Sequence, residues 1–493
     1  MLSLLPMDTQ DFINQLCQFR EHIYTSFSQR QDSLMDLLDA LSANQGVDSV
    51  VELSLNPLFR RGHSALYAAI DGLGATRDKG SPSAAPEGSP PRRRFPSPWI
   101  KAIAGVVPAP EHRGYWLFGM DVTPVARCHA VTMKDRESVY QPTVIAGQKP
   151  ITLGHNYSLM SAIPEAEVAG GPSWIVPVSV ERVTSFDSKS SVGQRQVERL
   201  LNDESLPWHP DLCVLVVDSD YSHQRFLYPF STPANRVIVS RCRTNRVFYR
   251  LPEIISEKRR GHPRWYGERF DLKDETTWHP PDQQDTLITT TAKGKQRIIT
   301  LRVWHDLLMK GSKAQPMHRY PSDLVEVQVS DPTAKRTFKP QWLIVYGQSR
   351  RQLLPRDAYQ SYAERFKLEH GIRFGKQHLL MTQLQTPGVT QEENWVQFSW
   401  LAYVQLWVAR LLANLLPQPW QRSLPTYKQG QITPSAVQRD FTRIIRQVGT
   451  PAAEGKPRGK SPGRLLGTTL DPRPRRPIIK RGRARPEKAK EVA

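Results

Sequence analysis

The chain has 493 residues and a net charge of +20, so it is long enough for a large core and more than one structural unit. So basic a chain indicates a polyanionic partner, with nucleic acid as the first candidate and a membrane surface as the second. Its four cysteines are far apart and include no C-x-x-C pair, which argues against a zinc site or a disulfide framework and fits a reducing cytosol.

The N-terminal region has helical periodicity, followed by a change of composition. Residues 1–74 are predicted to form a small helical domain, a candidate for DNA binding, in which DSLMDLLDALSA is the clearest amphipathic helix. The opening MLSLLPMDTQ has no basic segment before its apolar residues, so no signal peptide is expected. Residues 75–98 are rich in Pro, Ser, Gly and Arg and predict a linker with little fixed structure.

Residues 99–445 are predicted to form an α/β domain, because apolar strands alternate with amphipathic helices. A β-rich insertion is expected within it at about 235–335, where basic and aromatic residues are frequent. The longest apolar stretch, at 398–416, is broken by three polar residues and predicts a buried helix, with no membrane span expected. A helix is expected at 192–203, and the other candidate strands are 115–121, 173–183, 212–218 and 341–347.

Two of these strands lead into aspartates. YWLFGMD ends at Asp121 and LCVLVVD ends at Asp218, and both are the near-continuous apolar runs expected of central strands. Open α/β sheets bind their ligands at the carboxyl ends of the strands, which makes both aspartates candidates for a functional site. The alternative is that each aspartate simply begins a turn.

The stretch YAERFKLEHGIRFGK places four functional side chains on one helix face. At about 100° per residue, Tyr362, Arg365, Glu369 and Lys376 fall within roughly 60° of one another, beside an apolar stripe. Glu364 falls well away from that face. The alternative is a solvated face, in which Arg365 and Glu369 form a favourable i,i+4 pair.

Asp121, Asp218 and Glu369 could act together if the fold brings them to one place. Hard divalent ions such as Mg²⁺ prefer oxygen ligands and keep open positions for phosphate and water. Two such ions can activate an attacking hydroxyl and stabilise the leaving oxygen at phosphorus.

The order Asp, Asp, Glu and the spacing Y-x₂-R-x₃-E-x₆-K resemble the DDE transposases of bacterial insertion sequences. GMDVTP, VVDSDYS and the fifteen-residue stretch match the three catalytic regions of that group, within roughly residues 100–415. The resemblance implies a ribonuclease-H-like mixed sheet flanked by helices. It also implies that the β-rich insertion stands between the second Asp and the Glu, and that residues 99–445 are the catalytic domain.

The resemblance also implies a chemistry and its participants. Asp121, Asp218 and Glu369 would be ligands of Mg²⁺, for which Mn²⁺ is expected to substitute. Tyr362, Arg365 and Lys376 would hold the DNA backbone near the cleavage point. The enzyme would bind the terminal inverted repeats of its element as a dimer on paired ends, cut the strands and join the 3′ ends to target DNA. A cytoplasmic, nucleoid-associated protein is expected.

Two further basic segments are candidate DNA contacts. In SRCRTNRVFYR, Arg243 and Arg246 stand among alternating arginines that could follow a phosphate backbone if the segment is a strand; the alternative is an exposed strand kept soluble by its arginines. Residues 446–493 are predicted to be a basic, disordered tail. Within it, residues 456–493 hold 13 Lys and Arg against three acidic residues, which predicts non-specific, salt-sensitive affinity for DNA.

Two other functions remain open on the sequence. One is a ribonuclease-H-like nuclease or resolvase that cuts without joining. The other is a non-catalytic DNA-binding protein descended from a transposase, which would bind DNA yet show no metal-dependent cleavage. The intact carboxylate triad argues against the second.

Overall fold

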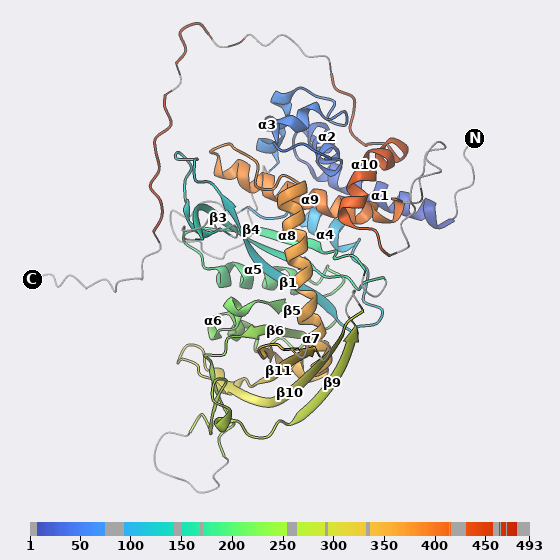
Figure 1. The fold of residues 1–493 in the computed structure, drawn as a ribbon. Helices are drawn as coiled ribbons and strands as arrows, with labels where there is room; N and C mark the ends of the chain where they lie inside the picture. The colour runs from blue at the N-terminus through green and yellow to red at the C-terminus, as the bar shows by residue number, and fades with distance from the viewer. Residues whose placement is uncertain are drawn as a thin grey trace, which may run out of the picture.

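The computed structural model describes residues 7–73, 93–141, 150–167, 171–253, 264–290, 294–331, 336–413, 415, 430–456, 463, 465–469 and 471–480. It is a mixed α/β structure with one large sheet flanked by helices (Figure 1). In that view the N-terminal helices lie at the top, the central strands in the middle and the β-rich insertion at the bottom. Most of the predicted linker lies outside the described residues.

The central part of the sheet has the strand order β4-β3-β1-β5-β6. The pairs β1–β3 and β3–β4 are antiparallel, whereas β1–β5 and β5–β6 are parallel. This is the arrangement of a ribonuclease-H-like fold, as the sequence predicts. The strands are β1 (Trp116–Ala126), β2 (Glu137–Tyr140), β3 (Ile151–Ala162), β4 (Val176–Val183), β5 (Cys213–Val217) and β6 (Arg236–Cys242), with α5 (Lys189–Leu201) before β5.

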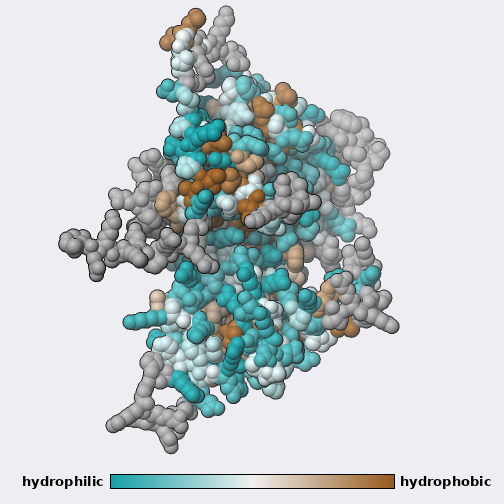
Figure 2. Space-filling model, turned by 60° about the vertical axis from the view of Figure 1, so that its left-hand side comes forward, coloured by the Kyte–Doolittle hydropathy of each residue, from teal (hydrophilic) through white to brown (hydrophobic). Residues whose placement is uncertain are grey.

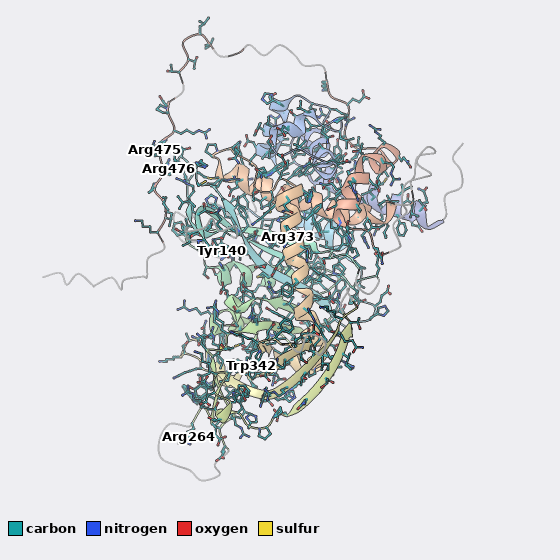
Figure 3. All side chains as sticks on the ribbon, in the orientation of Figure 1. Tyr140, Arg264, Trp342, Arg373, Arg475 and Arg476 are labelled. Carbon is teal, nitrogen blue, oxygen red and sulfur yellow. The ribbon has the colours of Figure 1, made fainter. Side chains whose placement is uncertain are left out.

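The insertion is β-rich and extends the same sheet beyond β6, in the order β6-β13-β11-β10-β7-β8. Its core is aromatic, because the Trp304 and Trp342 rings pack against each other and against Phe270. Trp342 is labelled in Figure 3. The strands are β7 (Val247–Tyr249), β8 (Arg269–Asp271), β9 (Gln283–Thr290), β10 (Gln296–Met309), β11 (Ser322–Asp331), β12 (Arg336–Thr337) and β13 (Gln341–Tyr346).

Helices from both ends of the chain cover the sheet. α9 packs on β4 and is buried along almost its whole length, as predicted for the apolar stretch at 398–416. The N-terminal helices and α10 pack against α9 in turn. These helices are α1 (Met7–Ser26), α2 (Gln31–Ser42), α3 (His63–Gly72), α4 (Ser97–Ala104), α9 (Val389–Ala409) and α10 (Pro434–Val448), and the short α6 (Gln224–Leu227) follows β5.

Part of the predicted tail is attached to the sheet edge. The Arg476 backbone N–H donates to the Val131 carbonyl at 2.9 Å, and the Ile479 N–H donates to the Arg136 carbonyl at 2.8 Å. Ile479 also forms a parallel bridge with Glu137 of β2. Figure 3 shows Arg475 and Arg476 on this segment, above Tyr140 at the end of β2. The segment therefore occupies backbone groups of an edge strand, which would otherwise be free to pair with another chain.

Within the described residues, no helix is both long and apolar enough to cross a membrane.

Candidate active site

Asp121 lies on β1, the central strand of the ribonuclease-H-like part. The parallel pairing of β1 with β5 ends at Gly119 and Val216, so Asp121 stands just past the end of β5. The strand itself continues to Ala126, because β3 pairs with it over that whole length. The prediction that this strand ends at Asp121 is therefore wrong, although the aspartate does lie at the carboxyl end of the parallel segment.

Asp218 follows β5 directly, as predicted. It is the N-cap of a short 3-10 helix at Ser219–Tyr221, and its Oδ1 accepts a hydrogen bond from the Asp220 N–H at 2.9 Å. Because β1 and β5 are neighbours and parallel, Asp121 and Asp218 lie at the same end of the sheet.

The stretch at 362–376 is helical but divided into two helices at Arg365. α7 (Pro355–Glu364) ends there and α8 (Phe366–His378) begins at the next residue. The Arg365 N–H donates to the Tyr362 carbonyl at 3.1 Å, the i to i−3 pattern of a tightened turn. Tyr362 therefore lies on α7, and Glu369 and Lys376 lie on α8.

The Arg365 guanidinium joins the predicted site residues. Its Nη1 lies 3.1 Å from Asp121 Oδ2, and its Nη2 lies 3.1 Å from Glu369 Oε1. The same guanidinium lies over the Tyr362 ring, 5.7 Å from its centroid. The solvated-face alternative is not supported for Arg365, whose side chain is only 10% exposed.

Electrostatic effects place Asp218 in the same group. Burial raises the pKa of Asp121, the Arg365 guanidinium opposes that rise, and the negative charges of Asp218 and Glu369 add to it. Burial also raises the pKa of Tyr362, which Arg365 opposes and the Asp218 carboxylate reinforces. Asp121 is thus close enough to Asp218 and to Glu369 for each of them to disfavour its charged form.

The charge of Asp121 also acts on Lys376, whereas Glu364 has other partners. Burial lowers the pKa of Lys376 to about 8, and the negative charge of Asp121 opposes that shift. Glu364 instead pairs with Arg113 at 3.3 Å and with Lys367 at 2.9 Å. The sequence prediction that Glu364 lies on a different face is therefore confirmed.

Close approach of α8 to the sheet positions Glu369. A Cβ atom on Gly119 of β1 would lie 2.5 Å from Leu368 Cδ1 of α8, and one on Gly371 would lie 2.4 Å from Ile175 Cδ1. Both contacts are inside van der Waals distance, so a side chain at either position would require Leu368 or Ile175 to move. Glu369 stands between Leu368 and Gly371, and this contact fixes its distance from Asp121.

The carboxylates suit a divalent ion by their chemistry. They are oxygen donors, Asp121 and Asp218 are half-buried, and the negative charges of Asp218 and Glu369 act on Asp121, which a bound cation would offset. In the described part of the chain, no three Asp, Glu, His or Cys side chains are grouped closely enough to hold one ion together. At this site the Arg365 guanidinium lies between Asp121 and Glu369 and neutralises both.

The two arginines predicted to contact DNA do not lie on one strand face. β6 ends at Cys242 and β7 begins at Val247, so Arg243 and Arg246 flank the turn between them. The Arg246 N–H donates to the Arg243 carbonyl at 3.2 Å, closing a turn around Thr244 and Asn245. The alternating-strand expectation is therefore wrong for these arginines. The Arg243 side chain pairs with Asp220 at 2.5 Å.

Arg373 and Lys189 also lie near the predicted site, although the sequence did not single them out. Arg373 is exposed one turn after Glu369 on α8, a spacing that could have revealed it. Figure 3 labels it on this helix. Lys189 lies 3.5 Å from Asp220, two residues beyond Asp218, a contact between distant segments that no local pattern reveals.

A sheet of this order, with one aspartate on its central strand and another at the end of the neighbouring strand, defines the protein as ribonuclease-H-like. The chain matches the family model described as DDE superfamily endonuclease over residues 22–303, more than half of its length. It therefore belongs to that family of nucleases. The match includes Asp121 and Asp218 and ends before Glu369. A search among curated proteins found no match.

Proposed function

We propose that this nuclease is the transposase of an insertion sequence, cutting DNA at the ends of its element and joining the 3′ ends to target DNA. The observation that supports the proposal is the pairing of Arg365 with both Asp121 and Glu369, at the end of the sheet where Asp218 follows the neighbouring parallel strand. The spacing Y-x₂-R-x₃-E-x₆-K supports the same group of enzymes.

Each side chain has a role in that reaction. Asp121, Asp218 and Glu369 would hold Mg²⁺, with Mn²⁺ as a substitute. Bound there, the ions supply an activated attacking oxygen and stabilise the leaving oxygen at phosphorus. Arg365 bridges two of the carboxylates, and its guanidinium can move from a carboxylate to a DNA phosphate, since both accept the same forked donors. Tyr362 packs against that guanidinium and orients it.

The substrate of this site would be the terminal inverted repeats of the element, paired in a dimer, together with target DNA. Lys376 and Arg373 lie on the same helix as Glu369 and supply positive charge for the backbone on both sides of the cut bond. The net charge of +20 supports the long-range attraction of DNA that such an enzyme needs.

The test is a set of alanine variants assayed for cleavage of DNA that carries the element end. We expect Asp121→Ala, Asp218→Ala and Glu369→Ala each to abolish Mg²⁺-dependent cleavage while DNA binding in EDTA is retained. Glu364→Ala is the matched control, because it removes a carboxylate from the same segment on another face. An inactive Glu364 variant beside an active Glu369 variant would overturn the assignment.

Strand transfer needs its own measurement. A supercoiled target plasmid incubated with precut donor ends should yield joined products if the protein is a transposase. Cleavage without any joined product would instead identify a nuclease or resolvase. Binding with neither product would identify a non-catalytic DNA-binding protein.

A further inference from the structure

A basic hollow lies between α6 and the ends of the insertion strands β7 and β10. Its volume is about 720 Å³, within the range of sites that hold small ligands or parts of larger ones. We call it the α6 pocket, because its lining residues include His223, Gln224 and Arg225 at the start of α6, with Arg246, Phe248 and Lys310. In Figure 2 the lower half of the molecule, where α6 and the insertion lie, is mostly hydrophilic.

The charges around the pocket are not neutralised. Arg225, Arg246 and Lys310 come from three separate segments, and within the described ranges none of them forms an ion pair. Burial lowers the pKa of His223, and the positive charges of Arg246 and Arg225 lower it further. The acidic group that opposes them is Asp220, which already pairs with Arg243 and Lys189. A concave surface lined by charges of one sign concentrates a ligand of the opposite sign.

The pocket also contains a polar atom without a partner. Gln224 Oε1 is buried and accepts no hydrogen bond from the residues that the structure describes. The oxygen and nitrogen of a side-chain amide are interchangeable in such an assignment, so this amide can also present its NH₂ to an acceptor. A buried polar group in a pocket is satisfied when a ligand arrives.

The pocket is connected to the carboxylate site through a short segment. His223 follows Asp218 by five residues, and its Nε2 lies 2.9 Å from Ser190 Oγ on α5. Asp220, between them, pairs with Arg243 at the turn that also carries Arg246. A DNA strand that passes Asp218 toward the insertion therefore meets these cations next.

We propose that the α6 pocket binds a backbone phosphate of the DNA strand that runs from the carboxylate site toward the insertion. Arg225, Arg246 and Lys310 supply the charge, and the Gln224 amide supplies a neutral donor. This role of the pocket rests on the proposed function, because it assumes that the DNA strand cut at the carboxylate site continues past Asp218 toward the insertion. It assigns Arg246 to DNA and leaves Arg243 as a structural partner of Asp220.

The experiment measures binding of the full chain to a fluorescent DNA duplex of mixed sequence, by anisotropy in EDTA over a series of salt concentrations. The double variant Arg246→Ala/Lys310→Ala should bind several-fold more weakly, and its slope of log affinity against log salt should fall by about 1. The control is Arg250→Ala/Arg269→Ala, which removes two charges from the same insertion. Those arginines are exposed and paired with Glu268 and Asp271, and we expect the wild-type slope.

The following outcomes would contradict phosphate binding by the α6 pocket. Equal slopes in wild type and the pocket variant, or an equal loss in both double variants, would overturn the proposal. Thermal stabilisation of wild type but not of the pocket variant by inorganic phosphate, without any change in DNA slope, would identify a free-anion site instead. Binding in EDTA requires no cleavage, so DNA binding by the α6 pocket can be confirmed even if the protein fails the cleavage test. If the protein cleaves DNA but the pocket variant keeps the wild-type salt slope, only the role of the pocket is disproved.

Discussion

At the scale of single residues, Arg365 is the centre of the candidate site. A guanidinium is planar and presents parallel donors, so it can hold two carboxylates at once in a way that an ammonium cannot. Here it lies between Asp121 and Glu369, which otherwise repel each other. Arg365 is therefore the cation in direct contact with both of these carboxylates.

The rate of single-turnover cleavage of a pre-bound DNA end should fall by roughly 10²–10³-fold in both Arg365→Ala and Arg365→Lys. Neither replacement has the two parallel N–H donors of the guanidinium. The alanine variant should also gain more thermal stability from Mg²⁺ than wild type does, since its carboxylates no longer have an internal counter-ion. Melting temperatures with and without Mg²⁺ measure this. Near wild-type cleavage in both variants would return this helix face to a purely structural role.

Lys376 gives the site a dependence on pH. Its pKa is lowered to about 8, so it loses its positive charge as pH rises through that value. A bound phosphate favours the charged form of Lys376 and raises its pKa again, so DNA affinity should fall above a pH of about 8. The total fall should be roughly tenfold for each unit by which DNA binding raises the pKa of Lys376. Anisotropy titrations across this range should show the fall in wild type. Lys376→Arg should keep the DNA affinity and remove its fall with pH, whereas Lys376→Ala should bind DNA weakly at every pH. If Lys376→Ala shows the same fall, the pH dependence belongs to another group.

At the scale of elements, the contact between α8 and the sheet determines where Glu369 lies. Gly371→Ala should gain about 1 kcal/mol of helix propensity but lose about 1–3 kcal/mol to overpacking, because its Cβ would lie 2.4 Å from the fully buried Ile175. We therefore expect a lower melting temperature and a larger loss of cleavage than stability alone explains. Ile175→Val, which removes the nearest atom, should restore part of both. Gly62→Ala is the control, since nothing lies within 4 Å of its added Cβ; an equal effect there would disprove this role of Gly371.

Local pattern predicts part of this architecture and leaves the rest open, for identifiable physical reasons. The apolar run before Asp218 and the helical spacing at 362–376 are properties of neighbouring residues, and the structure agrees with both. The continuation of β1 past Asp121 depends on β3, a partner that β1 meets only in the folded chain. The ion pairs of Arg365 with Asp121 and of Arg243 with Asp220 likewise join residues that are distant in the sequence, which spacing alone does not reveal.

The contacts of His155 bear out its interpretation as a hydrogen-bonded structural histidine. It is a chemically capable residue on β3, yet its Nδ1 lies 2.7 Å from Glu392 Oε1 of α9 and its Nε2 lies 3.0 Å from the Lys134 carbonyl. Glu392 is fully buried and also accepts a hydrogen bond from the Tyr157 hydroxyl at 2.7 Å. These contacts fasten α9 to the sheet, so His155 has a structural role there.

At the scale of the whole molecule, the N-terminal helices and the sheet are joined through α9. The buried Arg20 of α1 pairs with Asp39 of α2, donates to Gln405 of α9 at 3.0 Å and donates to the Gly449 carbonyl after α10 at 3.2 Å. The family match begins at residue 22, within α1, and ends at residue 303, so it covers α2 and α3 together with the strands from β1 to β9. The domain boundary at residue 74 stays a prediction, and this packing provides its test.

Arg20→Ala leaves Asp39 buried without its ion-pair partner, which should cost about 3–5 kcal/mol. If the N-terminal helices fold together with the sheet, the full chain unfolds in one transition and the variant moves all of it to lower temperature. Calorimetry can be compared with near-ultraviolet circular dichroism, which reports the packing of the tryptophans, all of which follow residue 74 in the sequence. A matched change is Arg61→Ala, whose partner Asp36 keeps a second arginine, Arg60, at 2.7 Å, so a small shift is expected. Two separate transitions, of which only the first moves in Arg20→Ala, would instead show that residues 1–74 form an independent domain.

The joint transition would mean that removing these helices exposes the apolar face of α9, so that a chain beginning after residue 74 should aggregate and show no cleavage.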